Sequence, residues 1–222
     1  KSSRASIALA EKVGEGAWCS VGQHPTDSGE SFDYGTFLEL AKSSKKVRAI
    51  GECGLDYYHL PKEEKESTTG REQQKDLFYQ HLNLAHETGL PLIIHCRDAH
   101  DDMIEALVHR FTTGGIIGSG SVSPSESVPD PIIREHGVMH CFTGNAIQAQ
   151  TYLDLGFLIS FTGIVTFTDQ YNEAVRTVPL EKMLIETDAP FLTPVPHRGK
   201  RNSPEYVEYV ARRIAEIKDI SF

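Results

Sequence analysis

Apolar residues in this chain gather in short runs, and the stretches between the runs repeat apolar residues at helical spacing. The short runs predict buried strands, and the repeating stretches predict amphipathic helices. Strands that alternate with helices are typical of an α/β fold built on a parallel sheet. Six strands are expected, at residues 17–22, 47–56, 92–94, 137–139, 157–166 and 182–185.

The run at 47–56 shows how these strands end. Its apolar residues are followed by glycines that let other atoms come close, and Glu52 and Asp56 are expected at its end. A single strand that ends on an acid is usually a strand that meets its loop. Here the ending recurs, because four other runs lead to His24, His95, His140 and the segment 186–188. In a parallel barrel the rim at the carboxyl ends of the strands carries the active site, so these side chains are candidates for chemistry.

Helices are expected at 1–12, 33–43, 72–88, 98–111, 146–155 and 203–218. His81 and His86 fall on the third of these without the partners that a metal site needs, so they are expected to play structural roles. The charged residues 61–71 are expected to form a loop over the rim. Residues 112–131 are rich in Gly, Ser and Pro, and are expected to form a surface loop insertion without a catalytic role.

Composition narrows the class of protein. With 222 residues, 39% of them hydrophobic, the chain can bury one sizeable core, so residues 1–222 are expected to form a single barrel domain. The net charge of −9 excludes a basic field that would attract nucleic acid nonspecifically. The four cysteines form no CxxC pair and are interpreted as small buried residues of a reduced cytoplasmic protein, rather than as disulfides or thiolate ligands. No apolar run has the length of a membrane span, and no signal peptide is expected at the start.

Glu52, His95, His140 and Asp188 form a candidate metal site, since each is expected at the end of a different strand. Carboxylates and imidazoles together suit Mg²⁺, Mn²⁺ or Zn²⁺. Glu52 can bridge two cations, and Asp188 can bind a cation and accept the proton of its water. A site of this kind carries out metal-assisted hydrolysis. The alternative is a barrel that merely has a polar rim.

Six motifs then occur in a fixed order along nearly all of the chain: GQHP at 22–25, GECGLDYY at 51–58, IHCRDA at 94–99, HCFTG at 140–144, ETDAP at 186–190 and RGKRNSP at 198–204. In these motifs the chain resembles the TatD family of metal-dependent deoxyribonucleases. The resemblance implies a (β/α)8 TIM-type barrel with one or two divalent cations at its rim, Mg²⁺ or Mn²⁺ or else Zn²⁺. It implies that Glu52, His95, His140 and Asp188 bind the metal, and that Glu52 and Asp188 are catalytic, with Asp188 accepting the proton of the attacking water.

Contacts to a substrate are inferred from the same motifs. The resemblance places His24 near the substrate phosphate. Arg97 and Arg201 are then candidate phosphate contacts because a guanidinium suits phosphate oxygens, and a salt bridge at the rim is the alternative. Tyr57, together with Tyr58, can stack on bases, which favours a nucleic-acid substrate, although tyrosines are common at barrel rims.

The chain departs from this family at both ends. Family members begin with a strand that bears a His-x-His motif, followed by a helix and a second strand, and they close with a further helical region. A barrel without its first two strands is therefore expected, with exposed edges and with one metal site that lacks its histidine pair. The insertion at 112–131 is a further departure.

The leading hypothesis is a cytoplasmic divalent-metal-dependent hydrolase that cleaves the phosphodiester bonds of DNA from the 3′ end and prefers single strands. The same metal-activated water can attack a carbonyl, so an ester or amide hydrolase, such as an aminoacyl-tRNA deacylase, is the second hypothesis. The third is a non-catalytic fragment that binds a metal or a partner. The sequence indicates no membrane association and no particular protein partner.

Overall fold

The structure is a computed structural model in which residues 2–113 and 136–222 are described. The chain divides into two compact units, Lys1–Gly137 and Val138–Phe222. The expected insertion at 112–131 lies outside the described residues, except for positions 112 and 113, which end a helix.

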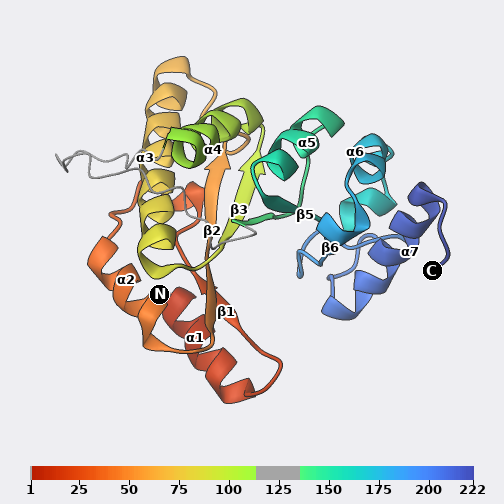
Figure 1. Ribbon diagram of the computed structural model, residues 1–222, viewed down its shortest axis with the longest axis horizontal. Helices are drawn as coiled ribbons and strands as arrows, with labels where there is room; N and C mark the ends of the chain where they lie inside the picture. The colour runs from red at the N-terminus through yellow and green to blue at the C-terminus, as the bar shows by residue number, and fades with distance from the viewer. Residues whose placement is uncertain (1, 114–135) are drawn as a thin grey trace. The chain divides into compact units, whose positions relative to one another are not determined.

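Strands and helices alternate in the first unit, as the sequence predicts (Figure 1). Strands β1, β2 and β3 pair side by side in chain order, and every pair is parallel. Helix α3 packs against β2, and α4 against β3. The elements are α1 (Ser2–Val13), β1 (Cys19–Val21), a 3₁₀ turn (Pro25–Asp27), α2 (Tyr34–Ser43), β2 (Val47–Asp56), α3 (Glu64–Thr88), β3 (Leu92–Arg97) and α4 (His100–Thr113).

Glu52 lies within β2 and not at its end, which corrects the expectation from the sequence. The strand continues to Asp56, but its register against β3 slips between Ile50 and Cys53, which pair with Leu92 and Ile94. This irregularity leaves Glu52 partly exposed in a strand that is otherwise almost entirely buried. A bulge re-aims a side chain in this way.

Helix α3 begins at Glu64, so the prediction of a loop over 61–71 is wrong from that residue onward. Residues 64–71, which form the first turns, are polar and mostly exposed, and they include the good helix formers Glu, Lys and Arg. They project into solvent and need no apolar face, so the hydrophobic pattern carries no sign of them. The predicted inner face is confirmed, with Leu77, Phe78, His81, Leu82 and Ala85 all buried. Gly89 ends the helix in the left-handed conformation, with φ +65°.

The second unit also alternates strands and helices. Strands β5 and β6 are parallel, and Phe142, in the loop that follows β4, donates its N–H to the Ser160 carbonyl of β5. The side chains of Phe142, Tyr152, Phe157 and Phe161 form much of the core. The elements are β4 (Gly137–Met139), which starts on the last residue of the first unit, then α5 (Ala146–Asp154), β5 (Phe157–Phe161), α6 (Asn172–Thr177), β6 (Met183–Ile185) and α7 (Val207–Lys218), with 3₁₀ turns at Gly163–Thr166, Leu180–Lys182 and Pro204–Tyr206.

Strand β5 is shorter than the sequence predicts. The side chain of Thr162 accepts the N–H of Ile164, and this contact opens a 3₁₀ turn in place of further strand. Helix α6 was not predicted, because its six residues are too few to show a periodic pattern. Among the described residues, none of the helices combines the length and the apolar character needed to cross a membrane.

Candidate metal centre

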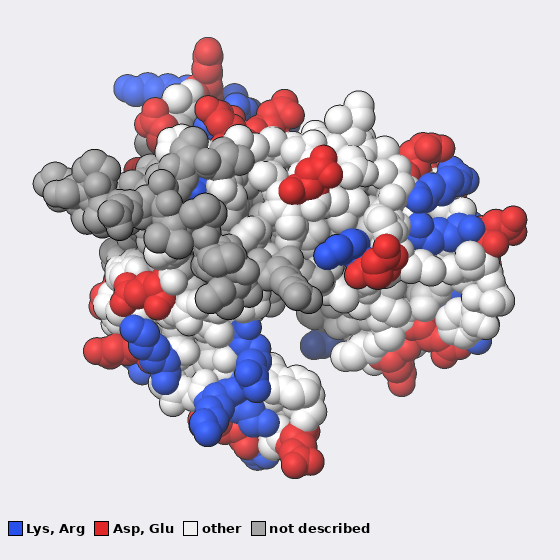
Figure 2. Space-filling view, viewed as in Figure 1, with Lys and Arg blue, Asp and Glu red and all other residues white. Residues whose placement is uncertain are grey.

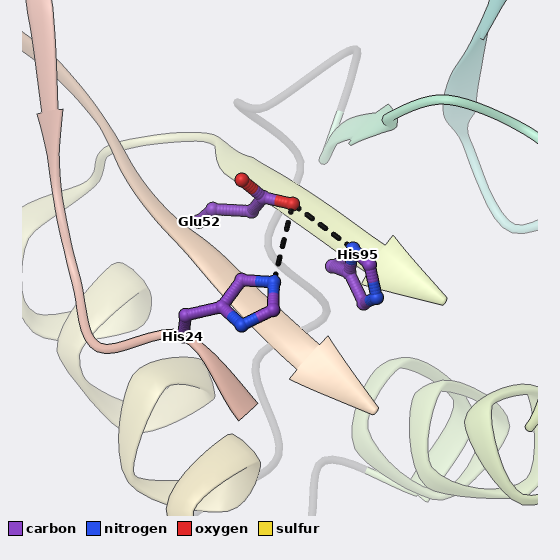
Figure 3. Close-up of side chains that lie close together, drawn as sticks. All are labelled: His24, Glu52 and His95. Atoms are coloured by element: carbon purple, nitrogen blue, oxygen red, sulfur yellow. Dashed lines mark hydrogen bonds and ion pairs between the residues drawn. The ribbon is translucent and has the colours of Figure 1, made fainter. Parts of the chain in front are cut away.

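His24, Glu52 and His95 come together in the first unit (Figure 3). His24 follows β1, Glu52 projects from the irregular part of β2, and His95 lies on β3. The Glu52 Oε1 atom is 3.0 Å from His95 Nδ1 and 3.6 Å from His24 Nε2. The sequence predicted Glu52 and His95 as neighbouring ligands. It placed His24 only near the substrate, whereas the structure brings its ring within 4.6 Å of the His95 ring.

The orientation of His24 is fixed by its own turn. Its Nδ1 atom accepts the N–H of Thr26 and lies 2.7 Å from the Thr26 hydroxyl. With Nδ1 engaged in this way, the Nε2 atom faces Glu52. His24 and Glu52 also line a cavity of about 440 Å³, together with Gln23 and the serines at the start of α1.

His81 anchors the loop that carries His24. Its Nε2 accepts the N–H of Gln23 at 3.0 Å, and its Nδ1 donates to the Leu77 carbonyl at 2.8 Å. Burial lowers the pKa of His81 to about 4, although the bond to Leu77 opposes this effect, so the ring is neutral. The prediction that His81 has a structural role is confirmed.

His95 lies between two carboxylates. While Nδ1 faces Glu52, Nε2 is 2.9 Å from Oδ2 of Asp56, whose side chain is only 1% exposed. Asp56 also accepts the backbone N–H of His59 and contacts the His59 ring. Burial disfavours the charged form of His95, but the bonds to Asp56 and Glu52 outweigh it and raise the pKa to about 9. Burial likewise disfavours the Asp56 carboxylate, yet His95 and His59 hold its pKa below the ordinary range.

His140 has a similar environment in the second unit. Its Nδ1 is 2.6 Å from Oε2 of Glu186, and its Nε2 is 3.8 Å from Oδ1 of Asp188. The other oxygen of Glu186 accepts the N–H of Cys141 at 2.7 Å. Burial raises the pKa of Glu186, but the bonds from His140 and Cys141 outweigh it and lower the pKa overall. The sequence predicted His140 and Asp188, and the structure places them as neighbours.

Asp56 and Glu186 are carboxylates beside the candidate ligands, and the sequence assigned neither of them a role. In each unit, one imidazole nitrogen contacts the more buried carboxylate and the other faces the more exposed one. This is the arrangement of a metal-binding histidine that a carboxylate orients through its second nitrogen. The only signal in the sequence was position, since Asp56 ends β2 and Glu186 stands two residues before Asp188.

The donor atoms of the first unit fit a divalent cation. One ligand atom from each of His24, Glu52 and His95 lies within 4.8 Å of the others. Ligands about 2.1 Å from a tetrahedral ion are roughly 3.4 Å apart, which is close to the contacts that Glu52 makes here. The four cysteines are free thiols, and burial raises the pKa of Cys53 far above its usual value. Oxygen and nitrogen atoms, and not thiolates, therefore form the candidate donor set.

The residues expected to contact substrate lie near these clusters. The Arg97 guanidinium is 3.6 Å from the centre of the Tyr58 ring. Tyr57 donates its hydroxyl to Asp102 at 2.5 Å, which raises its pKa in addition to the effect of burial. In the second unit, the exposed Arg201 lines a cavity that begins at Ala189, directly after Asp188. Figure 2 shows both basic and acidic side chains on this face of the molecule.

Comparison with known proteins identifies the family. The model of the family described as TatD related DNase matches residues 1–222. The chain belongs to this family. The TatD resemblance inferred from the six motifs is thus confirmed.

Curated relatives include two uncharacterized metal-dependent hydrolases. YabD of Bacillus subtilis is 39% identical over 92% of this chain and 71% of its own length. YcfH of Escherichia coli K12 is 38% identical over 91% of this chain and 66% of its own length. A TatD protein of Escherichia fergusonii, named a 3′-5′ ssDNA/RNA exonuclease, is 34% identical over 90% and 69%. The chain spans about two thirds of the length of these TatD-family relatives.

Solved structures agree with the predicted fold. The crystal structure of YjjV, a TatD homolog from Escherichia coli K12, matches with a TM-score of 0.75 at 26% identity, over 96% of this chain and 73% of that one. A TatD-family hydrolase from Entamoeba histolytica matches with a TM-score of 0.74 at 23% identity, over 99% and 75%, which shows the fold alone. The α/β prediction is confirmed, and the six strands of the described residues fit a partial TatD-type barrel.

Proposed function

We propose that this TatD-family chain is a divalent-metal-dependent hydrolase that cleaves the phosphodiester bonds of DNA and removes nucleotides from the 3′ end of single strands. The observation that carries the proposal is the cluster of His24, Glu52 and His95, whose nitrogen and oxygen atoms converge within 4.8 Å. Glu52 and His95 lie on the neighbouring parallel strands β2 and β3, and His24 follows β1. The name of the Escherichia fergusonii relative supports the choice of substrate.

Each unit contributes side chains to the proposed chemistry. Glu52, His95 and His24 would hold a cation in the first unit. His140 and Asp188, which are neighbours in the second unit, are proposed metal ligands there. A bound divalent cation lowers the pKa of a water molecule and offsets the charge of the phosphate. The donor set suits Mn²⁺ or Zn²⁺, and Mg²⁺ through the carboxylates.

The chain's own residues supply the remaining steps. Asp188 accepts the proton of the attacking water, since its partly exposed carboxylate is the less buried of the two that face His140. Arg97 and Arg201 bind phosphate oxygens, because a guanidinium presents paired N–H donors. Tyr57, the remaining predicted substrate contact, donates its hydroxyl to Asp102 of α4. The four free thiols favour a reduced cytoplasmic location.

The test is hydrolysis of a 5′-labelled single-stranded oligonucleotide by the 222-residue chain with Mg²⁺, with Mn²⁺ and with a chelator. We expect a ladder shortened from the 3′ end that disappears with chelator. Glu52→Gln, His140→Ala and Asp188→Asn should each abolish cleavage in a folded chain, whereas Glu205→Gln, a change at an exposed acid, should not. A folded chain that binds Mn²⁺ and hydrolyses aminoacyl esters but leaves the oligonucleotide intact would overturn the proposal.

A further inference from the structure

The exposed Tyr58 and the half-buried Arg97 form an aromatic and cationic pair beside the candidate metal centre. Arg97 is the last residue of β3, and Ile93, His95 and Arg97 are the alternate residues of that strand that are less buried. Successive residues of a strand face opposite sides, so Arg97 projects on the same side as His95. Its guanidinium carbon is 3.6 Å from the centre of the Tyr58 ring, which is within the range of a cation–π contact. Tyr58 remains 58% exposed.

The position of this pair is fixed by the residues on either side of Tyr58. The N–H of Tyr57 donates to the Arg97 carbonyl at 2.9 Å, which ties the end of β2 to β3. His59 donates its N–H to Asp56 at 3.0 Å, and its ring meets Tyr58 edge-on with the centroids 5.0 Å apart. Asp56 is also the carboxylate that contacts His95. The ring of Tyr58 is therefore held in register with the proposed metal ligand.

The neighbouring Tyr57 is occupied differently. Its hydroxyl donates to Asp102, and the Arg71 guanidinium lies 4.6 Å from its ring centre. Asp102 is itself paired with Lys75 at 2.8 Å. Tyr57 is thus part of a charged network between α3 and α4, and Tyr58 is the member of the aromatic pair that presents its ring to solvent.

We propose that Tyr58, backed by Arg97, is a stacking platform for an unpaired nucleobase at the 3′ end of the substrate, which deepens and rests on the proposed function. Every base offers a π face, so a stacking platform binds single strands without reading their sequence. A base within a duplex is stacked and paired and does not reach the ring. The Arg97 charge adds attraction for the phosphate of the same nucleotide.

The test measures binding apart from cleavage. Fluorescence anisotropy gives the affinity of the chain for a single strand whose 3′-terminal linkages are phosphorothioates, which resist hydrolysis and keep the negative charge. A second oligonucleotide carries a tetrahydrofuran residue in place of the 3′-terminal nucleoside and so lacks the base. Tyr58→Ala should weaken binding of the complete strand roughly tenfold and leave the abasic strand unaffected, and Tyr58→Phe should retain the wild-type affinity.

Trp18→Ala is the matched control. Trp18 is also 58% exposed and has a cation, Lys46, 6.0 Å from its ring, but it precedes β1 and so lies at the amino ends of the parallel strands. The Trp18→Ala chain should bind both oligonucleotides with the affinity of the wild type. Equal loss on both oligonucleotides in Tyr58→Ala, a similar loss in Trp18→Ala, or a wild-type chain that binds neither strand would each overturn the platform. If Tyr58→Ala weakens binding of the complete strand alone, but the wild-type chain cleaves no ordinary DNA, the platform stands and the proposed hydrolysis is refuted.

Discussion

Glu186 contacts the Nδ1 atom of His140 at 2.6 Å and, through its second oxygen, accepts the N–H of Cys141. When Nδ1–H donates to this carboxylate, the lone pair of the neutral ring lies on Nε2, the atom that faces Asp188. Asp56 holds His95 in the same way but through Nε2, which leaves Nδ1 facing Glu52. The two carboxylates thereby select which nitrogen of each histidine is available to a cation.

Glu186→Gln should weaken metal binding about 10- to 100-fold. The amide oxygen of the new residue takes the N–H of Cys141, so its NH₂ group faces Nδ1 of His140. That arrangement favours the tautomer with the proton on Nε2, which blocks the atom facing Asp188. Titration calorimetry with Mn²⁺ measures the change, and Glu205→Gln at an exposed site is the control. Unchanged Mn²⁺ affinity in Glu186→Gln would show that Glu186 does not orient His140.

Asp56→Asn should lower the free energy of unfolding by about 1–3 kcal/mol, because it places an amide donor against His95 and His59 in a site that is only 1% exposed. Urea unfolding of the apo chain gives the value. Asp76→Asn, on the exposed face of α3, should change stability by less than about 0.5 kcal/mol. If the two variants unfold at the same urea concentration, Asp56 has no part in holding the end of β2.

His81 should make the fold sensitive to mild acid. Its pKa is about 4 in the folded chain, against an ordinary value of 6.5, so its contribution is complete above pH 6.5 and is lost as pH falls towards 4. Over that window the unfolded chain binds a proton that the folded chain excludes, and the loss is on the order of 3 kcal/mol.

His81→Gln tests this pH dependence, because the amide oxygen can still accept the N–H of Gln23 but does not titrate. Stability curves from pH 7 to pH 4 should fall less steeply for this variant than for the wild type. His86→Gln, at an exposed position on the same helix, should follow the wild-type curve. Parallel curves for all three chains would refute the assignment of the acid sensitivity to His81.

Gly54→Ala should be severely destabilising, by about 3 kcal/mol or more. Gly54 has φ +141°, and a Cβ atom there would overlap the backbone carbonyl of His95 on the neighbouring strand. Thermal unfolding is the measurement. Gly29→Ala is the control, since an added Cβ meets nothing within 4 Å there and φ is not in the positive range that strains other residues. A Gly54→Ala chain as stable as Gly29→Ala would mean that β2 and β3 are not so closely paired.

Local pattern was sufficient to predict much of the secondary structure. The bounds of β2 and β4 agree with the predicted strands, because short apolar runs favour buried strands. The burial of His81 also followed from helical spacing. The first turns of α3 and the short α6 were missed, because polar or brief helices lack the periodicity from which the others were predicted.

The sequence by itself determined which residues are able to do chemistry, namely the acids and histidines that follow the apolar runs, and the order of six motifs determined the family. Only the tertiary structure decided their partners. The register slip in β2 turns Glu52 towards His95 and His24, and Asp56 and Glu186 reach the second nitrogens of two histidines. Contacts between residues 39 to 46 positions apart depend on strand pairing and on the path of each loop. No local pattern of residue types encodes those distances.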